Sequence, residues 1–307
     1  MRDLRVALAL AGLAFALALQ PHGRPAEGLS IGFSQTTGFE AESAILQTLD
    51  GLAPVAGRGG LEAFGAITGP PGPPIGDGSA PPGIWRVIGW GCDTSPVFTS
   101  CAPDGITDPA ASDPFANPNR SALRITGLSG FLTDLDWQDI TLIEHHNNII
   151  SGNALQTIEI DSILRLGADP VAIADPETLV INFRETRNLT CGVAPLPGAP
   201  INPLGSTCDD FFLVEALNLA PIALGGGVFI DFRLDPRDGA LVCTGVPAND
   251  PPACGGYVGN AIIVYTAESD TNSLAVQARL RVVPVAEPAT LLLLGIGILG
   301  AAIVRRR

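Results

Sequence analysis

The sequence contains no lysine, so all 17 basic residues are arginine, against 31 acidic residues. The formal net charge is −14. It becomes −18 without residues 1–18, which carry a net charge of +1, and residues 289–307, which carry +3. Such a body repels nucleic acid, which excludes nucleic-acid partners. The acidic surface either keeps an exported protein soluble or attracts divalent cations.

Catalytic signatures are also missing. There is no G-x-S-x-G nucleophile motif and no P-loop. The only histidines are His22, His145 and His146, and no cysteine pair has the CxxC spacing of a zinc site. We therefore predict no enzyme, no catalytic residue, no metal centre and no cofactor.

Long apolar runs occur only at the two ends of the chain. The N-terminal run, Val6–Leu19, follows the charged start MRDLR and has the length of a signal peptide. Small residues at Ala16 and Ala18, and again near Ala26, offer cleavage positions. We predict a signal peptide over residues 1–26 and export of the mature chain.

The C-terminal run, Ala289–Val304, has 16 uncharged residues followed by Arg305, Arg306 and Arg307. As a helix it would span about 24 Å, short of the roughly 30 Å hydrocarbon core. Terminal arginines favour a membrane segment with its end in the cytoplasm over a buried core helix.

The cysteine count agrees with export, because six cysteines suit an oxidising compartment. Sequence alone does not choose among the 15 connectivities that six cysteines allow. The simplest pairing is between sequence neighbours, each bond contributing about 2–3 kcal/mol. These pairs are Cys92–Cys101, Cys191–Cys208 and Cys243–Cys254.

Glycine and proline are abundant (36 and 27 residues), and the chain between residues 84 and 284 alternates short apolar runs with turn residues. The best strands are 273–283 and 228–234, with candidates at 122–128, 139–143, 157–161, 179–183, 210–214 and 260–265. This pattern predicts an all-β domain, an antiparallel, jelly-roll-like β-sandwich over residues 84–284. Residues 27–83 are expected to form an N-terminal segment and proline-rich linker, with a short helix at 41–52, and residues 285–307 the tail. The three tryptophans are expected in the core.

The most polar cluster is the stretch EHHNN. Neighbouring strand residues point to opposite faces, so His145 would share a face with Asn147, and His146 with Asn148. One metal ion would not reach both imidazoles unless the chain turns there. The structural interpretation is that these side chains satisfy a strand end by hydrogen bonds.

Acidic residues in predicted loops suit calcium, which prefers oxygen ligands, although no EF-hand spacing is present. Hydrogen bonds within the predicted loops would explain the presence of these acidic residues nearly as well. They are Glu185, Asp209, Asp210, Glu268 and Asp270.

The tail, EPATLLLLGIGILGAAIVRRR, resembles the PEP-CTERM sorting signal of bacterial exported proteins. Ala286, Glu287 and Pro288 stand where that signal has Pro-Glu-Pro, and Arg305–Arg307 form its basic end. The resemblance implies transient insertion in the inner membrane and processing by a membrane protease, exosortase. It also implies a role in exopolysaccharide or biofilm matrix.

The body resembles the THxN family of PEP-CTERM proteins. Its Thr-His-x-Asn motif would correspond to Glu144–Asn147, with glutamate in place of threonine. Further matching marks are Trp85, the ETRN stretch from Glu185 to Asn188, the Cys191 and Cys208 pair followed by aspartate, and the TAESDTN stretch that ends at Asn272.

The leading functional prediction is a non-enzymatic exported protein of the cell surface or extracellular matrix, with exopolysaccharide as a candidate partner. One alternative is a calcium- or glycan-binding module that uses His145, Asn147, Glu185 and Glu268. Another is a secreted hydrolase in which Glu144 and a neighbouring histidine supply acid–base chemistry.

Overall fold

The structure is a computed structural model that describes residues 28–48, 62–66, 84–91, 121–148, 150, 153–167, 177–184, 194, 196–206, 208–215 and 219–283. These residues form strands, one 3-10 turn (η2, Pro252–Cys254) and no α-helix. The strands are β1 (Ser30–Thr48), β2 (Glu62–Ala66), β3 (Ile84–Trp90), β4 (Ser121–Gly127), β5 (Ser129–Thr133), β6 (Gln138–Asn147), β7 (Asn153–Leu166), β8 (Glu177–Arg184), β9 (Asp210–Glu215), β10 (Ile222–Gly225), β11 (Val228–Arg237), β12 (Leu241–Cys243), β13 (Ile262–Thr266) and β14 (Asp270–Val282).

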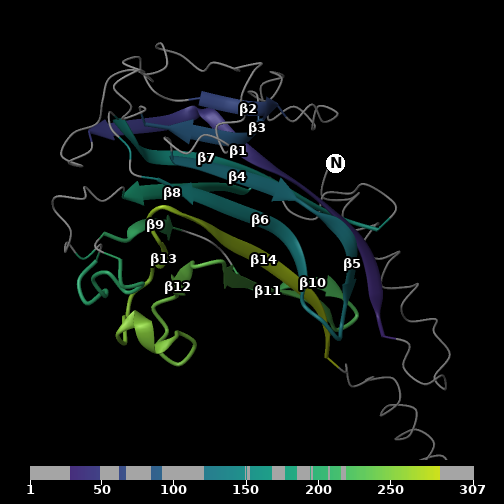
Figure 1. The fold of residues 1–307 in the computed structure, drawn as a ribbon. Coiled ribbons are helices and arrows are strands. Elements are labelled where there is room, and N and C mark those ends of the chain that lie inside the picture. The colour runs from purple at the N-terminus through teal and green to yellow at the C-terminus, as the bar shows by residue number, and fades with distance from the viewer. Residues whose placement is uncertain are drawn as a thin grey trace, which may run out of the picture.

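All of these strands belong to one antiparallel sheet, which curls on itself (Figure 1). The order is β10-β11-β14-β6-β4-β3-β1-β7-β8-β9-β13-β12, with β2 added to β3 and β5 added to β1. The prediction of an all-β antiparallel fold is confirmed. Instead of two separate sheets, the described strands form a continuous ladder, because β1 pairs with β3 on one side and β7 on the other.

The alternating pattern places one face of each strand inside the curl. In β14, Leu274, Ala278 and Leu280 are buried. Each of them pairs with an apolar residue of β11. The predicted strand segments at 122–128, 179–183, 210–214 and 260–265 coincide with β4, β8, β9 and β13 to within two residues at their ends, and the segments at 139–143 and 157–161 lie inside the longer strands β6 and β7. Strand alternation therefore accounts for most of the sheet.

The core has a large cluster between the two halves of the curled sheet. It joins residues of β3, β4 and β6 to residues of β8, β9 and β13, including Trp90, Leu123, Ile181, Phe212 and Val264. A second cluster lies where β1 begins and β14 ends. Of the tryptophans, Trp90 is fully buried and Trp85 packs partly against the large cluster, but Trp137 is only half-buried, so its predicted core position is wrong.

The helix predicted at residues 41–52 is wrong where the structure describes it, because β1 continues to Thr48. Pairing with β7 runs along most of the strand and shifts register between Glu40 and Ile45. At this bulge the Ser43 hydroxyl donates to the Glu40 carbonyl (2.7 Å) and accepts from the Glu159 N–H (2.8 Å). Tertiary pairing thus overrides local helix propensity. The sheet also begins at Ser30, ahead of the domain start expected at residue 84.

Glycine is required where β4 passes β1. A Cβ on Gly127 would lie 2.3 Å from the Gln35 carbonyl oxygen, and the Gln35 N–H donates to the Leu128 carbonyl next to it (2.8 Å). Because the two backbones approach so closely here, the chain pairs with β3 as β4 and then, directly after Gly127, with β1 as β5. A glycine turn joins β10 to β11 at Gly226 and Gly227, both with positive φ.

A disulfide joins Cys243 to Cys254, both fully buried, as expected for that pair of sequence neighbours. Cys208 is disulfide-bonded as well, and the described residues contain no free cysteine. In the part of the chain that the structure describes, no helix is long and apolar enough to span a membrane. The predicted signal peptide, residues 67–83 of the predicted linker, and the sorting tail with Glu287, Pro288 and Arg305–Arg307 lie outside that part, as do Cys92, Cys101, Cys191, Glu185 and Asn188.

Candidate functional site

β6 contributes to two groups of polar side chains, one near each end of the strand. The C-terminal group contains the histidine and asparagine residues that the sequence analysis singled out. The N-terminal group surrounds Asp139. We call the first the buried cluster (His145, Asn147, Thr266 and Asn272) and the second the open pocket.

His145 lies in the interior of the curled sheet. Its ring stacks on Trp90 of β3, with 5.7 Å between ring centroids and 21° between planes, and it meets the edge of Phe212 of β9 at 6.5 Å. The side chain is 2% exposed. His145 therefore links both halves of the curl through aromatic contacts.

The imidazole is neutral and its orientation is fixed. Nδ1 lies 3.0 Å from the Thr266 Oγ1, and that hydroxyl donates to the Asp210 carbonyl at 3.4 Å. Because the hydroxyl proton is used there, Nδ1 is assigned the donor role. Burial, with a smaller contribution from His146, lowers the pKa of His145 to about 3. A side chain that is uncharged and enclosed in this way is suited to packing and not to proton transfer.

Asn147 and Asn272 hold the turn between β13 and β14. The Asn147 Nδ2 donates to the Thr266 carbonyl (3.3 Å), and the Asn147 Oδ1 is buried with no described partner. Asn272 accepts from the Ala267 N–H (2.9 Å) and donates to the Ala267 carbonyl (3.0 Å). Asn272 of β14 also pairs with His145 of β6 across the two strands. The EHHNN and TAESDTN stretches of the sequence therefore meet in the buried cluster.

The remaining residues of the EHHNN stretch face elsewhere. Glu144 lies 3.8 Å from Arg124 on the more exposed face of β6, opposite to His145. His146 shares that side of the strand by alternation and is half-buried. The Asn148 backbone exchanges hydrogen bonds with the Ser121 hydroxyl, at 3.0 and 3.2 Å. Glu144 and His145 therefore do not converge on one substrate position.

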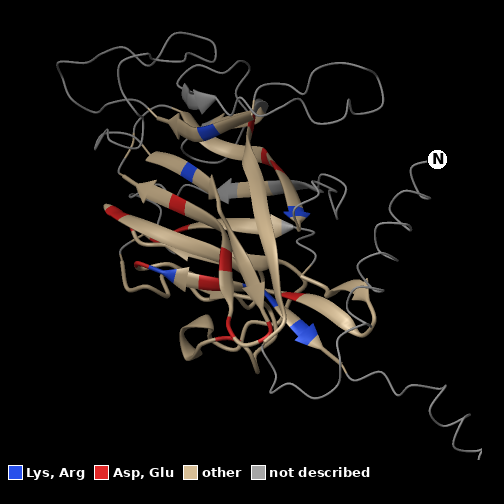
Figure 2. Cartoon of the chain, turned by 90° about the vertical axis from the view of Figure 1, so that its right-hand side faces the viewer, with Lys and Arg blue, Asp and Glu red and all other residues tan. Residues whose placement is uncertain are grey.

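The acidic loop residues are engaged by their own loops. Asp209 accepts from the Leu204 N–H (2.9 Å) and from the Ser206 hydroxyl, and Asp270 accepts from the Thr271 N–H (2.7 Å). Glu268 lies half-buried in the β13–β14 turn. The described residues contain no group of three or more His, Cys, Asp or Glu side chains placed to hold a metal ion. Figure 2 shows acidic residues spread along the sheet instead of gathered in one place.

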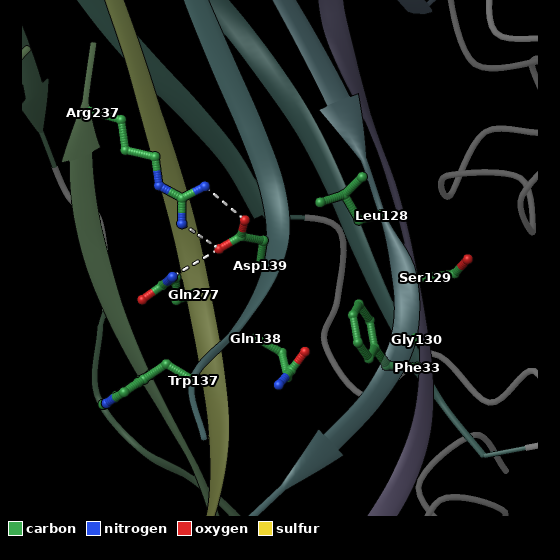
Figure 3. A pocket seen from close by; sticks show the side chains of 9 residues that line it. All are labelled: Phe33, Leu128, Ser129, Gly130, Trp137, Gln138, Asp139, Arg237 and Gln277. Atoms are coloured by element: carbon green, nitrogen blue, oxygen red, sulfur yellow. Dashed lines mark hydrogen bonds and ion pairs between the residues drawn. The ribbon is translucent and has the colours of Figure 1, made fainter. Parts of the chain in front are cut away.

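The open pocket lies between β5 and the sheet formed by β6, β14 and β11 (Figure 3). Its volume is about 420 Å³. A β-bulge between Val276 and Gln277 changes the register with β6, so that Gln277 stands opposite Asp139. Bulges commonly redirect side chains in this way. The lining residues are Phe33, Leu128, Ser129, Gly130, Trp137, Gln138, Asp139, Arg237 and Gln277.

A charged network forms the wall of the pocket at Asp139. Arg237 donates to both Asp139 oxygens at 2.8 Å, and Gln277 Nε2 adds a third bond at 2.7 Å (Figure 3). Arg237 also binds Asp235 (2.7 and 2.9 Å). The Arg237 hydrogen bond lowers the pKa of Asp139, and Asp139 in turn raises the pKa of Arg237. The carboxylate is therefore ionised and oriented at neutral pH.

Trp137 forms an aromatic part of the same wall. The guanidinium carbons of Arg233 and Arg279 lie 4.5 and 4.4 Å from its ring, as cation–π partners. Arg233 also donates to the Gln277 side chain (2.7 Å). Sequence reasoning missed this pocket. The available signal was the alternation of charge along β11, from Asp231 to Arg237, on the face opposite to its apolar residues.

Residues 284–307 match the protein-family model described as PEP-CTERM protein-sorting motif. No curated protein matches the chain. The match supports the first of the two resemblances: the chain is an exported protein whose C-terminal sorting signal passes the membrane and is processed by exosortase.

Proposed function

We propose that the chain is a non-enzymatic protein of the bacterial cell surface or extracellular matrix, associated with exopolysaccharide or biofilm and related to the THxN family. The tail would anchor it only transiently, as a short transmembrane helix, before exosortase removes it. The proposed function needs no metal or cofactor. The observation that carries the proposal is the sorting motif at residues 284–307, attached to an exported all-β body.

The body supports this proposal in two ways. The Cys243–Cys254 bond suits an oxidising compartment outside the cytoplasm. His145, one of the two histidines that the hydrolase alternative could use, is enclosed, and Glu144 lies on the opposite face of its strand. Both features favour a structural or binding role over acid–base catalysis.

Fractionation of cells expressing the full chain, or a chain that ends at residue 283, tests this proposal. We expect the full chain at the surface or in the medium with its tail removed. The shortened chain should leave the cell without passing through a membrane-bound form. A full chain that never enters the membrane fraction, or that still carries residues 289–307 outside the cell, would refute the role of the tail.

A second proposed activity, sugar binding, is favoured by the open pocket. Its aromatic side chains, Phe33 and Trp137, lie beside an oriented carboxylate and the amides of Gln138 and Gln277. Sugar rings need this combination of apolar contact and directional hydrogen bonding. We therefore propose that the pocket binds one neutral sugar unit of a polysaccharide.

Saturation-transfer NMR with cellobiose and maltose as probes tests sugar binding. We expect saturation transfer to a probe with the wild-type protein and its loss in Asp139→Asn. The matched control is Glu144→Gln, which weakens the 3.8 Å pair with Arg124 near the other end of β6 but leaves the pocket lining intact. An equal loss in both variants, or no transfer at all, would refute the proposed site.

A further inference from the structure

Exposed apolar side chains gather at one end of the sheet. Of eight large hydrophobic residues that are exposed in the described part of the chain, four lie there: Phe131, Leu135, Val282 and Val283. Phe131 is 67% and Leu135 74% exposed. Scattered exposed residues are ordinary, but a gathering of them indicates an interaction surface. We call this group the tail-proximal end.

The strand pairing brings these residues together. Thr133, at the end of β5, pairs with Ser30, at the start of β1. Leu135 lies against Gly28, just before β1. Val282 pairs with Val228, and the Val283 N–H donates to the Gly227 carbonyl (2.7 Å). Figure 1 shows the start of β1, β5, β10 and the end of β14 together at the lower right.

The sorting motif starts at this same end. Only residues 284–288 separate Val283 from the apolar run that begins at Ala289. The six Cα–Cα steps from Val283 to Ala289 reach at most about 22 Å even when the chain is fully extended. While the tail spans the membrane, Val283 is therefore within about 22 Å of the hydrocarbon core. Part of that distance is taken up by the lipid headgroups.

Charge near this end is mixed. Arg279 and Arg281, in the last part of β14, share one carboxylate, that of Asp231, at 3.8 and 2.8 Å. Asp134 and Asp136 flank the exposed Leu135. The apolar side chains and the short connection to the tail, and not charge, therefore favour contact of this end with the bilayer.

We infer that the tail-proximal end rests on the bilayer surface while the sorting signal spans the membrane, with Phe131 and Leu135 in the headgroup region. The inference rests on the proposed sorting function and adds the orientation of the body and the residues that touch lipid. Exposed aromatic and aliphatic side chains next to arginine are typical of interfacial contact. The body would then present its opposite end to the exterior until the tail is cleaved.

Depth-dependent fluorescence quenching tests this inference on the full chain in vesicles of phosphatidylethanolamine and phosphatidylglycerol. An introduced cysteine, Leu135→Cys, carries an environment-sensitive dye, and the vesicles contain lipids spin-labelled at the headgroup. The matched control is Val258→Cys. Val258 is 73% exposed, and the N–H of the next residue, Gly259, donates to the carbonyl of Gly245, which follows β12. β12 lies across the molecule from β5 (Figure 1).

We expect strong quenching of the dye at position 135, little at position 258, and loss of the difference in a chain that ends at residue 283. A chain that inserts into vesicles but shows equal quenching at both positions would refute the orientation and leave sorting intact. A chain that does not bind vesicles at all would refute both. Shielding of position 135 in the shortened chain without lipid would identify a second copy as the occupant and contradict the inference.

Discussion

The two ends of β6 place similar polar side chains in opposite environments. At the C-terminal end, His145 and Asn147 are enclosed between the halves of the sheet and bonded to Thr266. At the N-terminal end, Asp139 is ionised, held by Arg237, and lines a pocket. A conspicuous sequence motif can therefore stabilise the fold, whereas the open pocket is built from residues that no motif marks.

The largest expected effect is on the buried cluster. His145→Ala removes a stacked ring from the core and the hydrogen bond from its Nδ1 to the Thr266 hydroxyl, so the free energy of unfolding should fall by about 3–5 kcal/mol. Urea unfolding measures this loss. The neighbouring half-buried residue provides the control, because His146→Ala should cost much less. Equal losses would mean that the two histidines have equivalent surroundings.

Stability should also depend on pH through His145. Its pKa is about 3 in the folded state against an ordinary value of 6.5, so only the unfolded chain takes up the proton as pH falls below 6.5. The contribution to stability is thus present above the unfolded pKa and is lost as pH falls, by about 2 kcal/mol between pH 7 and about pH 5. Comparing thermal unfolding of the wild type and His145→Phe across this range isolates the effect. Identical pH slopes would contradict it.

The disulfide should contribute somewhat less than the His145 ring. Cys243 and Cys254 close a short loop, which the Asp250 carboxylate also holds through the N–H groups of Thr244 and Gly245 (2.7 and 3.1 Å). Replacing both cysteines with serine should lower the free energy of unfolding by about 2–3 kcal/mol. Chemical unfolding of this double variant measures the loss. A loss close to zero would show that the loop stays closed without the bond.

The smallest expected loss of stability is at the open pocket. Asp139→Asn weakens a partly exposed network, so we expect a cost of about 1 kcal/mol after allowance for solvent screening. The same change should abolish sugar binding. His145→Ala is therefore expected to reduce mainly stability, and Asp139→Asn mainly sugar binding. A large loss of stability in Asp139→Asn would place the network among the structural features of the protein.

Sequence reasoning reached the strands because period-two alternation reports burial directly, as in β11 and β14. It did not reach the curl, since the contact of His145 with Thr266 joins residues 121 positions apart. The helix predicted at residues 41–52 failed because pairing with β7 and the Ser43 hydrogen bonds outweigh local preference. The pocket was missed because it depends on a register shift opposite Gln277, which no local pattern encodes.

Processing of the sorting signal is the central claim, so intact mass spectrometry of protein recovered from outside the cell tests it most directly. We predict a chain that lacks the N-terminal signal peptide and ends before Ala289. Recovery of envelope-free protein that still carries residues 289–307 would contradict this claim.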